Sequence, residues 1–303
     1  MNRTIRIGTR DSELALWQAN TVKRALEELG YSAVLVPVKS EGDLNLDQPL
    51  YAMGITGIFT KTLDVAMITG KIDIAVHSMK DVPTSLPKGI VEGAVLKRAN
   101  PGDILLHKGL DFLDREGTIA TGSLRRKAQW LNRYKDHNMV DLRGDVNTRL
   151  AKLKKNSWDG AIFAAAGLDR IELKPDDHLE LNWMIPAAAQ GAMLVVVMEN
   201  DAGSREAVSG LDHDETALCV HIEREFLRVL EGGCTAPIGA LAEVIEGKIN
   251  FKGGLFSLDG QQKIEVEKSI SIEEREDFGR RCALEILENG GTDLMKNIRQ
   301  VLK

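Results

Sequence analysis

The sequence predicts an α/β protein made of two doubly wound lobes and a small C-terminal α+β domain. Short β-branched runs alternate with helical patterns through the first two thirds of the chain, and the last third changes to consecutive strands followed by helices. Alternating strands and helices are typical of parallel sheets covered on both faces, whereas a block of strands followed by helices indicates an α+β unit. A polar segment near Pro101 separates two stretches of the alternating pattern.

Hydrophobic periodicity and turn residues place the elements of the two lobes. Strands are expected near 3–8, 33–38, 72–76, 90–96, 117–120, 138–142, 160–163 and 193–198. Helices are expected near 12–29, 60–69, 123–134, 146–156 and 164–171. The first helix has the clearest boundaries, because Asp11 or Ser12 can cap its N-terminus and Gly30 can end it.

Two crossings are predicted to connect the lobes. The first is 96–103, where a Pro-Gly breaker favours a linker, and the second lies around 185–190. This assigns 1–97 together with 192–210 to one lobe and 101–188 to the other.

The third domain is expected to span 214–303. It begins with an amphipathic helix over roughly 214–230. Three strands (238–245, 248–257 and 262–270) and two helices (273–288 and 292–302) follow. This block order is typical of a separate α+β domain.

Composition places the chain among soluble globular proteins. Its 303 residues are 43% hydrophobic and 28% charged, a balance that excludes a disordered chain and fits two or three domains. No apolar run approaches the roughly 20 residues needed to cross a bilayer, and the first residues lead into a short strand rather than a signal-peptide core. We therefore expect a cytoplasmic protein without membrane contact, and we expect a monomer.

The three cysteines, Cys219, Cys234 and Cys282, are too few and too scattered for a disulfide framework. No Cys-x-x-Cys or His-x-x-x-His spacing suggests a metal site, so reduced thiols and no metal are expected. Cys219 and Cys282 lie on helical patterns and are expected in the core. Cys234 follows two glycines, and Pro237 stiffens the exit of its loop, so the thiol is presented on a shaped turn. Nearby arginines would favour the nucleophilic thiolate; a small buried residue in a tight loop is the alternative.

Positive charge is concentrated in one segment of an acidic protein. The formal net charge is -6, yet residues 121–155 carry ten Lys or Arg against three Asp, an excess of +7 that leaves -13 for the rest of the chain. A focused basic segment indicates a site for an anionic ligand, whereas a nucleic-acid binder is more often basic overall. Only Trp130 and Tyr134 supply aromatic rings there, so no base-stacking platform and no nucleic-acid partner are expected. For the lysines within 152–155, a solvated helix face is the simpler explanation.

Polar side chains follow four of the predicted strands at the point where each strand ends. They are Arg10 and Ser12, Lys80 and Asp81, Ser123 with Arg125 and Arg126, and Arg143 with Gly144 and Asp145. In open parallel sheets, ligands bind outside the carboxyl ends of the strands, where helix N-termini point at them. We therefore expect these side chains to line one cleft that binds a polyanion.

Several of these residues have a simpler structural explanation when taken alone. Ser12 and Ser123 are good helix N-caps. Lys80 beside Asp81 is compatible with an ordinary surface pair. His77, one residue past a buried strand, is more simply a packed histidine than a catalyst.

Arg125 and Arg126 are harder to explain by structure alone. Both lie in a first helical turn, where the helix macrodipole disfavours cations. An anion bound beside them would remove this conflict.

Taken together, the motifs resemble those of one family, the hydroxymethylbilane synthases, also called porphobilinogen deaminases. The most specific are the block His-Ser-Met-Lys-Asp-Val-Pro at 77–83 and the Gly-Gly-Cys loop at 232–234. Other matching stretches lie at 6–12, 14–18, 57–61, 73–76, 121–126, 142–150, 166–170, 190–192 and 237–240. Their common order extends the resemblance essentially from end to end.

The resemblance implies a fold and a chemistry. The two lobes would be similar to those of periplasmic solute-binding proteins, and Cys234 would hold a dipyrromethane cofactor through a thioether. On this primer, four porphobilinogen molecules would be deaminated and joined head to tail. Hydrolysis would then release hydroxymethylbilane, a precursor in tetrapyrrole and haem biosynthesis.

The resemblance also implies roles for individual residues. Every porphobilinogen ring carries two carboxylates, for which arginine is a suitable counter-charge. The residues expected to bind substrate are Arg10, Ser12, Arg143, Arg149, Arg170 and Gln190. Besides Cys234, those expected to hold the cofactor are Lys80, Asp81, Ser123, Arg125, Arg126, Gly144 and Asp145. Asp81, with Lys80, is expected to be catalytic, because a fixed carboxylate would stabilise the cationic azafulvene and the charge on the attacking pyrrole.

The sequence departs from the family pattern at a few positions. Ala52 and Thr56 stand where many members have lysines, in a loop expected to cover the cleft, while Lys61 is kept. Ala189 replaces a usual Gly, which bears on hinge behaviour, and Asp145 replaces a usual Asn.

Two other functions are compatible with the same motifs. A solute-binding module would share the two lobes but would need neither Asp81 nor a group on Cys234. A family member that binds the cofactor without catalysis is suggested by Ala52 and Thr56 alone. A pyrrole adduct on Cys234 would exclude the solute-binding module. Consumption of porphobilinogen would exclude the family member without catalysis.

Overall fold

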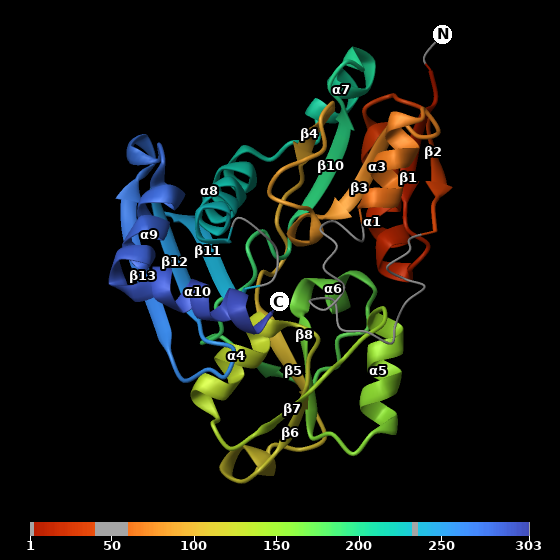
Figure 1. Ribbon diagram of the computed structural model, residues 1–303. Helices are drawn as coiled ribbons and strands as arrows, with labels where there is room; N and C mark the ends of the chain where they lie inside the picture. Colours follow the sequence, from red (N-terminus) through yellow and green to blue (C-terminus); the bar gives the residue numbers. More distant parts are fainter. Residues whose placement is uncertain (1–2, 40–59, 232–235, 303) are drawn as a thin grey trace.

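The computed structural model describes residues 3–39, 60–231 and 236–302. Within these residues the strands form three separate sheets of five, five and three strands. Figure 1 shows one five-stranded sheet and its helices at the upper right, the other at the bottom and the three-stranded sheet at the left. Two α/β lobes and a small α+β domain are therefore confirmed, whereas the residue boundaries assigned to the domains stay a prediction.

The first lobe has helices on both faces of its sheet. Its strands are β1 (Ile5–Thr9), β2 (Ala33–Pro37), β3 (Ile74–Ser78), β4 (Ile90–Val95) and β10 (Met193–Met198), in the order β2-β1-β3-β10-β4. Its helices are α1 (Glu13–Glu28), α3 (Lys61–Ile68) and α7 (Ala202–Ser209), the last of which was not predicted. Leu63 and Met67 of α3 pack on one face of the sheet, and Val22 of α1 and Val208 of α7 pack on the other.

The second lobe has the same layered plan. Its strands are β5 (Asp103–His107), β6 (Thr118–Ala120), β7 (Asn138–Val140), β8 (Gly160–Ala164) and β9 (Leu179–Glu180), in the order β7-β6-β8-β5-β9. Its helices are α4 (Leu124–Arg133), α5 (Val146–Lys155) and α6 (Ala165–Arg170). Leu153 of α5 and Leu168 of α6 cover one face, and Trp130 of α4 covers the other.

Each of these sheets is mixed rather than wholly parallel. β10 is antiparallel to β3 and β4, and β5 is antiparallel to β8 and β9. Both strands follow a crossing between lobes directly, without the crossover helix that a parallel connection needs. As a result, the first residue of each lies beside the last residue of a neighbour: Met193 pairs with Ser78, and Asp103 pairs with Ala164. β5 and β9 were not predicted, and Asp103 had been assigned to the linker.

The third domain packs its helices against one antiparallel sheet. It contains α8 (Asp214–Glu231), β11 (Ile238–Ile245), β12 (Lys248–Phe256), β13 (Lys263–Ser271), α9 (Phe278–Ile286) and α10 (Thr292–Val301). Phe226, Phe251 and Phe278 meet edge-on in its core. The helix expected at 273–288 begins later, because Asp277 adopts a left-handed φ of 52° that interrupts the helical backbone. None of the described helices is both long and apolar enough to span a bilayer.

Glu223 of α8 ties the third domain to both crossings between the lobes. Its carboxylate accepts hydrogen bonds from Arg98 of the first crossing, at 2.5 and 3.1 Å, and from the backbone N–H of Ala189 in the second, at 2.6 Å. The backbone N–H of Ala242 in β11 donates to it at 2.8 Å. Ala189 itself has φ 61°, a conformation that favours glycine, so the departure noted at this position places a strained residue in the crossing.

Candidate active site

A cavity of about 320 Å³ lies between the two lobes, at the ends of their strands. The predicted residues that line it are Arg10, Ser12, Lys80, Asp81, Ser123, Arg125, Arg126, Arg143, Gly144, Asp145, Arg149 and Gln190. They come from both lobes and from the second crossing. The structure therefore brings the four strand ends together in one cleft, while the binding role of each residue stays a prediction.

Two predicted site residues are not placed in this cavity. Arg170 does not line it: its guanidinium donates to Gly191 O at 2.6 Å and lies 5.7 Å from the centre of the Trp17 ring. Burial lowers the pKa of Arg170 to about 10. The side chain therefore helps to hold the turn after Gln190, and its contact with substrate stays a prediction. Cys234, like Ala52 and Thr56, lies outside the described residues.

The N-termini of α1, α4 and α5 all open on the cavity. Ser12 accepts a hydrogen bond from the backbone N–H of Ala15 and Ser123 from that of Arg126, each at 3.4 Å. Asp145 caps α5 by accepting from the N–H of Thr148 at 2.7 Å. The explanation of the two serines as N-caps is thus confirmed. A capping serine still has its own O–H to donate, whereas an ionised Asp145 can only accept.

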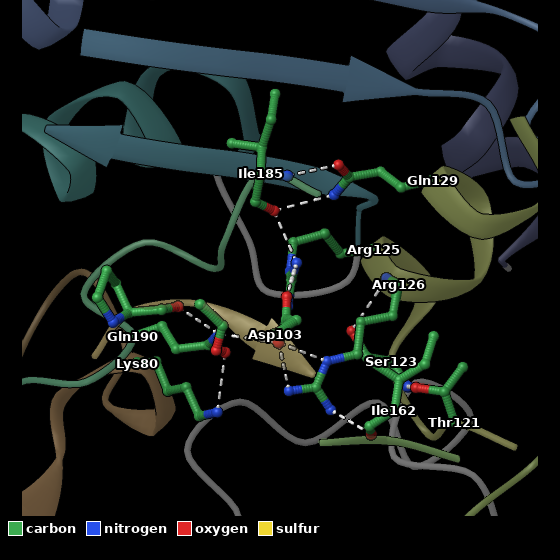
Figure 2. A network of polar contacts seen from close by, with 12 residues as sticks. Lys80, Asp103, Thr121, Ser123, Arg125, Arg126, Gln129, Ile162, Ile185 and Gln190 are labelled. Carbon is green, nitrogen blue, oxygen red and sulfur yellow. Dashed lines mark hydrogen bonds and ion pairs between the residues drawn. The ribbon is translucent and has the colours of Figure 1, made fainter. Parts of the chain in front are cut away.

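Beneath the cavity lies one buried carboxylate, Asp103, at the start of β5 (Figure 2). Its Oδ2 accepts a hydrogen bond from Arg125 Nη1 at 2.7 Å. Its Oδ1 accepts from Arg126 Nε at 3.0 Å and Nη2 at 2.8 Å, and from Gln190 Nε2 at 2.9 Å. The two arginine side chains are only 6% and 7% exposed. One carboxylate therefore joins two cations of the second lobe to the second crossing.

Asp103 resolves the charge conflict predicted for the first turn of α4. Burial would raise the pKa of Asp103, but Arg125 and Arg126, with the hydrogen bonds they donate, hold it well below its usual range. The group is therefore ionised at neutral pH. The protein itself therefore supplies an anion beside the two arginines, and this carboxylate offsets one of their two positive charges.

Sequence reasoning missed Asp103 because of the direction of β5. The rule that ligands gather at the carboxyl ends of strands points to residues that follow a strand, and Asp103 is the first residue of one. Because β5 is antiparallel to β8, its first residue lies at the same edge as the last residue of β8. The sequence does contain one signal for the direction of β5: an apolar run follows the first crossing with no helix between them.

Lys80 reaches this cluster from the first lobe. Its Nζ donates to Gln190 Oε1 at 3.1 Å, while Gln190 Nε2 also donates to Pro101 O at 2.7 Å. Burial, and then the charge of Arg126, lower the pKa of Lys80 to about 8. The explanation of Lys80 as an ordinary surface pair is wrong, because its ammonium lies in the cavity wall and donates to the second crossing.

Asp81 lies on a short 3-10 turn, Met79–Asp81, that follows β3 and lines the cavity. Asp81 itself is exposed, whereas Met79 is fully buried and anchors the turn. Arg224 of α8, only 3% exposed, donates to Val82 O at 2.9 Å and to Pro83 O at 2.7 Å. A buried arginine from the third domain thus fixes the backbone next to Asp81. No local motif indicates this contact, because the partners are far apart in the sequence.

Arg143 and Arg149 carry positive charge on the second lobe's side of the cavity. Arg149 Nε donates to Gly144 O at 2.8 Å, and burial together with the charge of Arg126 lowers the pKa of Arg149 to about 10. Gly144 has φ 112°, and a Cβ there would lie 2.5 Å from Thr148, so this turn requires glycine. Burial also lowers the pKa of Arg143.

The lysines within 152–155 divide into two kinds. Lys154 and Lys155 are exposed, which confirms the solvated helix face. Lys152 instead donates from Nζ to Arg143 O at 3.0 Å and so supports the backbone of a cavity residue.

The remaining singled-out residues are structural. Cys219 and Cys282 are buried, and burial raises their thiol pKa to about 12 and about 11, which confirms them as core residues. His77 is 6% exposed, and burial, with the charge of Arg10, lowers its pKa to about 4, so the packed neutral histidine is confirmed. Among the described residues, no three His, Cys, Asp or Glu side chains are grouped as a metal site requires.

The fold and the cleft define a class of protein: two α/β lobes enclosing a cavity suited to a polyanion, with a third domain that fixes the turn carrying Asp81. Residues 5–206 match the family model of the porphobilinogen deaminase dipyromethane cofactor binding domain, and residues 217–288 match that of the porphobilinogen deaminase C-terminal domain. The chain therefore belongs to the porphobilinogen deaminase family.

Curated relatives match over the whole chain. The sequence is 42% identical to the porphobilinogen deaminase of Desulfitobacterium hafniense, over 99% of each chain. It is also 42% identical to that of Pelotomaculum thermopropionicum, over 99% of this chain and 98% of the relative.

Solved structures with a similar backbone include periplasmic binding proteins. A substrate-binding protein of an ABC transporter from Coxiella burnetii has a TM-score of 0.43 and 16% identity, over 68% of this chain and 91% of that one. A methionine-binding protein has a TM-score of 0.45 and 13% identity, over 69% of this chain and 89% of that one.

Proposed function

We propose that this protein is a porphobilinogen deaminase, or hydroxymethylbilane synthase, a transferase of tetrapyrrole biosynthesis. It joins four porphobilinogen molecules head to tail with loss of ammonia and releases hydroxymethylbilane by hydrolysis. The main support is the gathering of Arg10, Arg143, Arg149 and Lys80 around one cavity that has Asp81 in its wall. In a chain of this family, such a cavity has the charge that a growing chain of acidic pyrroles requires.

The cavity residues fit a dipyrromethane cofactor. A dipyrromethane made from two porphobilinogen units carries four carboxylates, and the cavity offers guanidinium and ammonium groups together with three helix N-termini. The residues proposed to hold it are Lys80, Asp81, Ser123, Arg125, Arg126, Gly144 and Asp145. Bound through a thioether to Cys234, the cofactor supplies a tethered pyrrole carbon to which the first substrate is joined.

Asp81 is the proposed catalytic carboxylate, with Lys80 beside it. An exposed carboxylate on a fixed turn can accept hydrogen bonds from pyrrole N–H groups and stabilise the positive charge created on the substrate when ammonia leaves. Lys80, whose pKa lies at about 8, is mainly protonated at neutral pH and supplies a cation for a substrate carboxylate.

The remaining lining residues are proposed to orient the substrate. Arg10, Arg143 and Arg149 can each face a carboxylate with two N–H donors. Ser12 can donate its O–H while it caps α1, and Gln190 links the substrate side of the cavity to the crossing.

We further propose a cytoplasmic monomer with the three domains assigned from the sequence. Separate sheets with separate cores support the division into 1–97 with 192–210, 101–188 and 214–303. Size-exclusion chromatography with light scattering tests the monomer, because a dimer would double the measured mass.

Intact-mass spectrometry of the purified protein tests the function together with the attachment site. The protein from a host that supplies porphobilinogen should carry two pyrrole units, and Cys234→Ala should carry none. Cys219→Ala and Cys282→Ala are matched controls, since both thiols are buried and protonated, and both should keep the adduct. An unmodified wild-type protein that leaves added porphobilinogen unconsumed would overturn the proposed function.

A further inference from the structure

Asp103 has no hydrogen-bonding capacity left for a ligand. Its side chain is 0% exposed, and its oxygens already accept from Arg125, twice from Arg126, and from Gln190. A carboxylate has about four lone-pair positions, so these donors occupy all of them. Any effect of Asp103 on a reaction must therefore act through its partners.

Those partners reach the cavity from both lobes. Arg125 and Arg126 line it from α4, Gln190 lines it from the second crossing, and Lys80 of the first lobe donates to Gln190 Oε1 at 3.1 Å. Figure 2 shows these side chains arranged around Asp103. A continuous line of polar contacts thus runs from Lys80 through Gln190 and Asp103 to Arg126, across the boundary between the lobes.

The charge of this cluster also depends on Asp103. Arg125 and Arg126 repel each other, and neither can turn to water because their side chains are 6% and 7% exposed. With Lys80 they make three cations around one carboxylate. Asp103 offsets one of these three positive charges, and the remaining positive charge faces the cavity.

We infer that Asp103 is a positioning residue for the reaction. It holds Arg125 and Arg126 in the orientation that ligand carboxylates require. Through Gln190 it also fixes the position of Lys80, on the opposite lobe, relative to the two arginines. This inference rests on the proposed deaminase function and adds to the site a residue that does not line the cavity.

Asp73 provides a matched control, because it is also a buried carboxylate bound by arginine. Its Oδ1 accepts from Arg6 Nη2 at 2.6 Å and its Oδ2 from Arg6 Nε at 3.0 Å. It precedes β3, at the opposite end of that strand from the turn that carries Asp81. Asp73→Asn therefore removes a buried, arginine-bound charge without touching the cavity.

The test compares Asp103→Asn with Asp73→Asn in cofactor-loaded protein, by porphobilinogen consumption across the pH range around 8. We expect kcat of Asp103→Asn to fall on the order of 100-fold, as a misplacement of about 1 Å can cause, with a smaller change in KM. The groups that act on the Lys80 charge are Arg126, Asp81, Asp103 and Arg125. Removing Asp103 removes a charge that raises the pKa of Lys80, so the alkaline limb of kcat/KM should move to lower pH. Asp73→Asn should change neither kcat nor the position of this limb.

An unchanged kcat with an unmoved alkaline limb in Asp103→Asn would overturn the inference. Asp103→Glu keeps the charge and should return the limb toward its wild-type position. If Asp103→Asn does not fold, Gln190→Met replaces it. This change leaves both arginine pairs of Asp103 intact and removes the contacts of the Gln190 amide with Lys80, Pro101 and Gly102. Because Gln190 also lines the cavity, the readout is the alkaline limb of kcat/KM: a moved limb in Gln190→Met supports the inference, and a wild-type kcat with an unmoved limb overturns it. Wild-type protein that fails to consume porphobilinogen would show instead that the proposed function, and with it this inference, is wrong.

Discussion

Asp73 and Asp103 are chemically alike but have opposite surroundings. Each is a buried carboxylate at the start of a strand, and each is bound by two arginines. The partners of Asp73, Arg3 and Arg6, keep 60% and 38% of their side chains exposed, whereas the two partners of Asp103 keep 6% and 7%. The first group fastens the edge of a sheet in contact with solvent, and the second lies beneath a cavity.

Strand direction explains why the same chemistry serves two purposes. β3 runs parallel to β1, and its start lies at the edge of the sheet away from the cavity, while β5 runs antiparallel to β8 and starts at the cavity edge. The position of an Asp–Arg group relative to the strand therefore does not reveal its role until the direction of the strand is known. Changes at the cavity edge should lower turnover, and changes at the far edge should lower stability alone.

The largest effect is expected for Asp81→Asn, set against Asp73→Asn at the other end of β3. Replacing the carboxylate that faces the substrate should lower kcat on the order of 100- to 1,000-fold, because the developing positive charge loses its counter-ion. The folded protein and its two-unit adduct should be retained, which intact mass and a thermal melt can verify. Normal turnover in Asp81→Asn would show that Asp81 is not the catalytic carboxylate.

A second difference is expected in the free energy of unfolding. Asp103→Asn should cost about 3–5 kcal/mol, because two buried guanidinium groups lose their counter-ion and cannot reach water. Asp73→Asn should cost only about 1–2 kcal/mol, since Arg3 and Arg6 can turn to solvent. Urea unfolding at neutral pH measures both. Equal losses would mean that burial of the arginines does not distinguish the two groups.

The acid dependence of this difference follows from the pKa of Asp103. Its arginine partners hold that pKa well below the usual range, against the opposing effect of burial. The stabilisation is therefore complete above the pKa of an unfolded aspartate, about 4, and is lost as the pH falls through the lower folded value. The gap between wild type and Asp103→Asn should accordingly narrow only at strongly acidic pH.

An intermediate effect is expected for the pH dependence of Lys80. Burial lowers the pKa of Lys80 to about 8, so the ammonium loses its proton as the pH rises through that value. The kcat/KM of wild type should fall about tenfold per pH unit above it. Lys80→Arg keeps its charge across this range, so its kcat/KM should be lower overall but flat. A wild-type profile without this alkaline limb would show that the charge of Lys80 does not contribute.

Local patterns in the sequence predicted what depends on neighbouring residues. Ser12 and Ser123 were correctly placed as N-caps, and the turn after β3 was correctly placed at the cleft, because caps and strand ends are set within a few residues. The buried state of His77 and Cys219 also followed from the apolar residues beside them. These predictions required no knowledge of which strands are neighbours.

Sequence reasoning failed where the role of a residue depends on distant partners. Asp103 acquires its role from an antiparallel pairing with β8, and Arg224 from a contact with the Val82–Pro83 backbone more than a hundred residues away. The hydrogen bond from Arg170 to the Gly191 carbonyl was likewise not predicted, because it joins two separate elements, while the role of Arg170 in substrate binding stays a prediction. Charge and spacing identify a candidate residue, but the order and direction of the strands decide whether it lies at the cavity edge of the sheet or at the opposite edge.

The smallest effect is expected for an exposed hydrogen bond between the lobes, at the cavity lining. Asn147 Nδ2, in the first turn of α5, donates to Glu13 Oε2, in the first turn of α1, at 2.6 Å, and both residues line the cavity. Because both side chains are exposed, Asn147→Ala should change the free energy of unfolding by no more than about 0.5 kcal/mol and kcat by about twofold at most. Asn20→Ala is the matched control, since its exposed amide donates within α1, to Leu16 O. A tenfold loss of kcat in Asn147→Ala, with no loss in the control, would contradict this expectation. Burial of a contact between the lobes would then not predict how strongly that contact affects turnover.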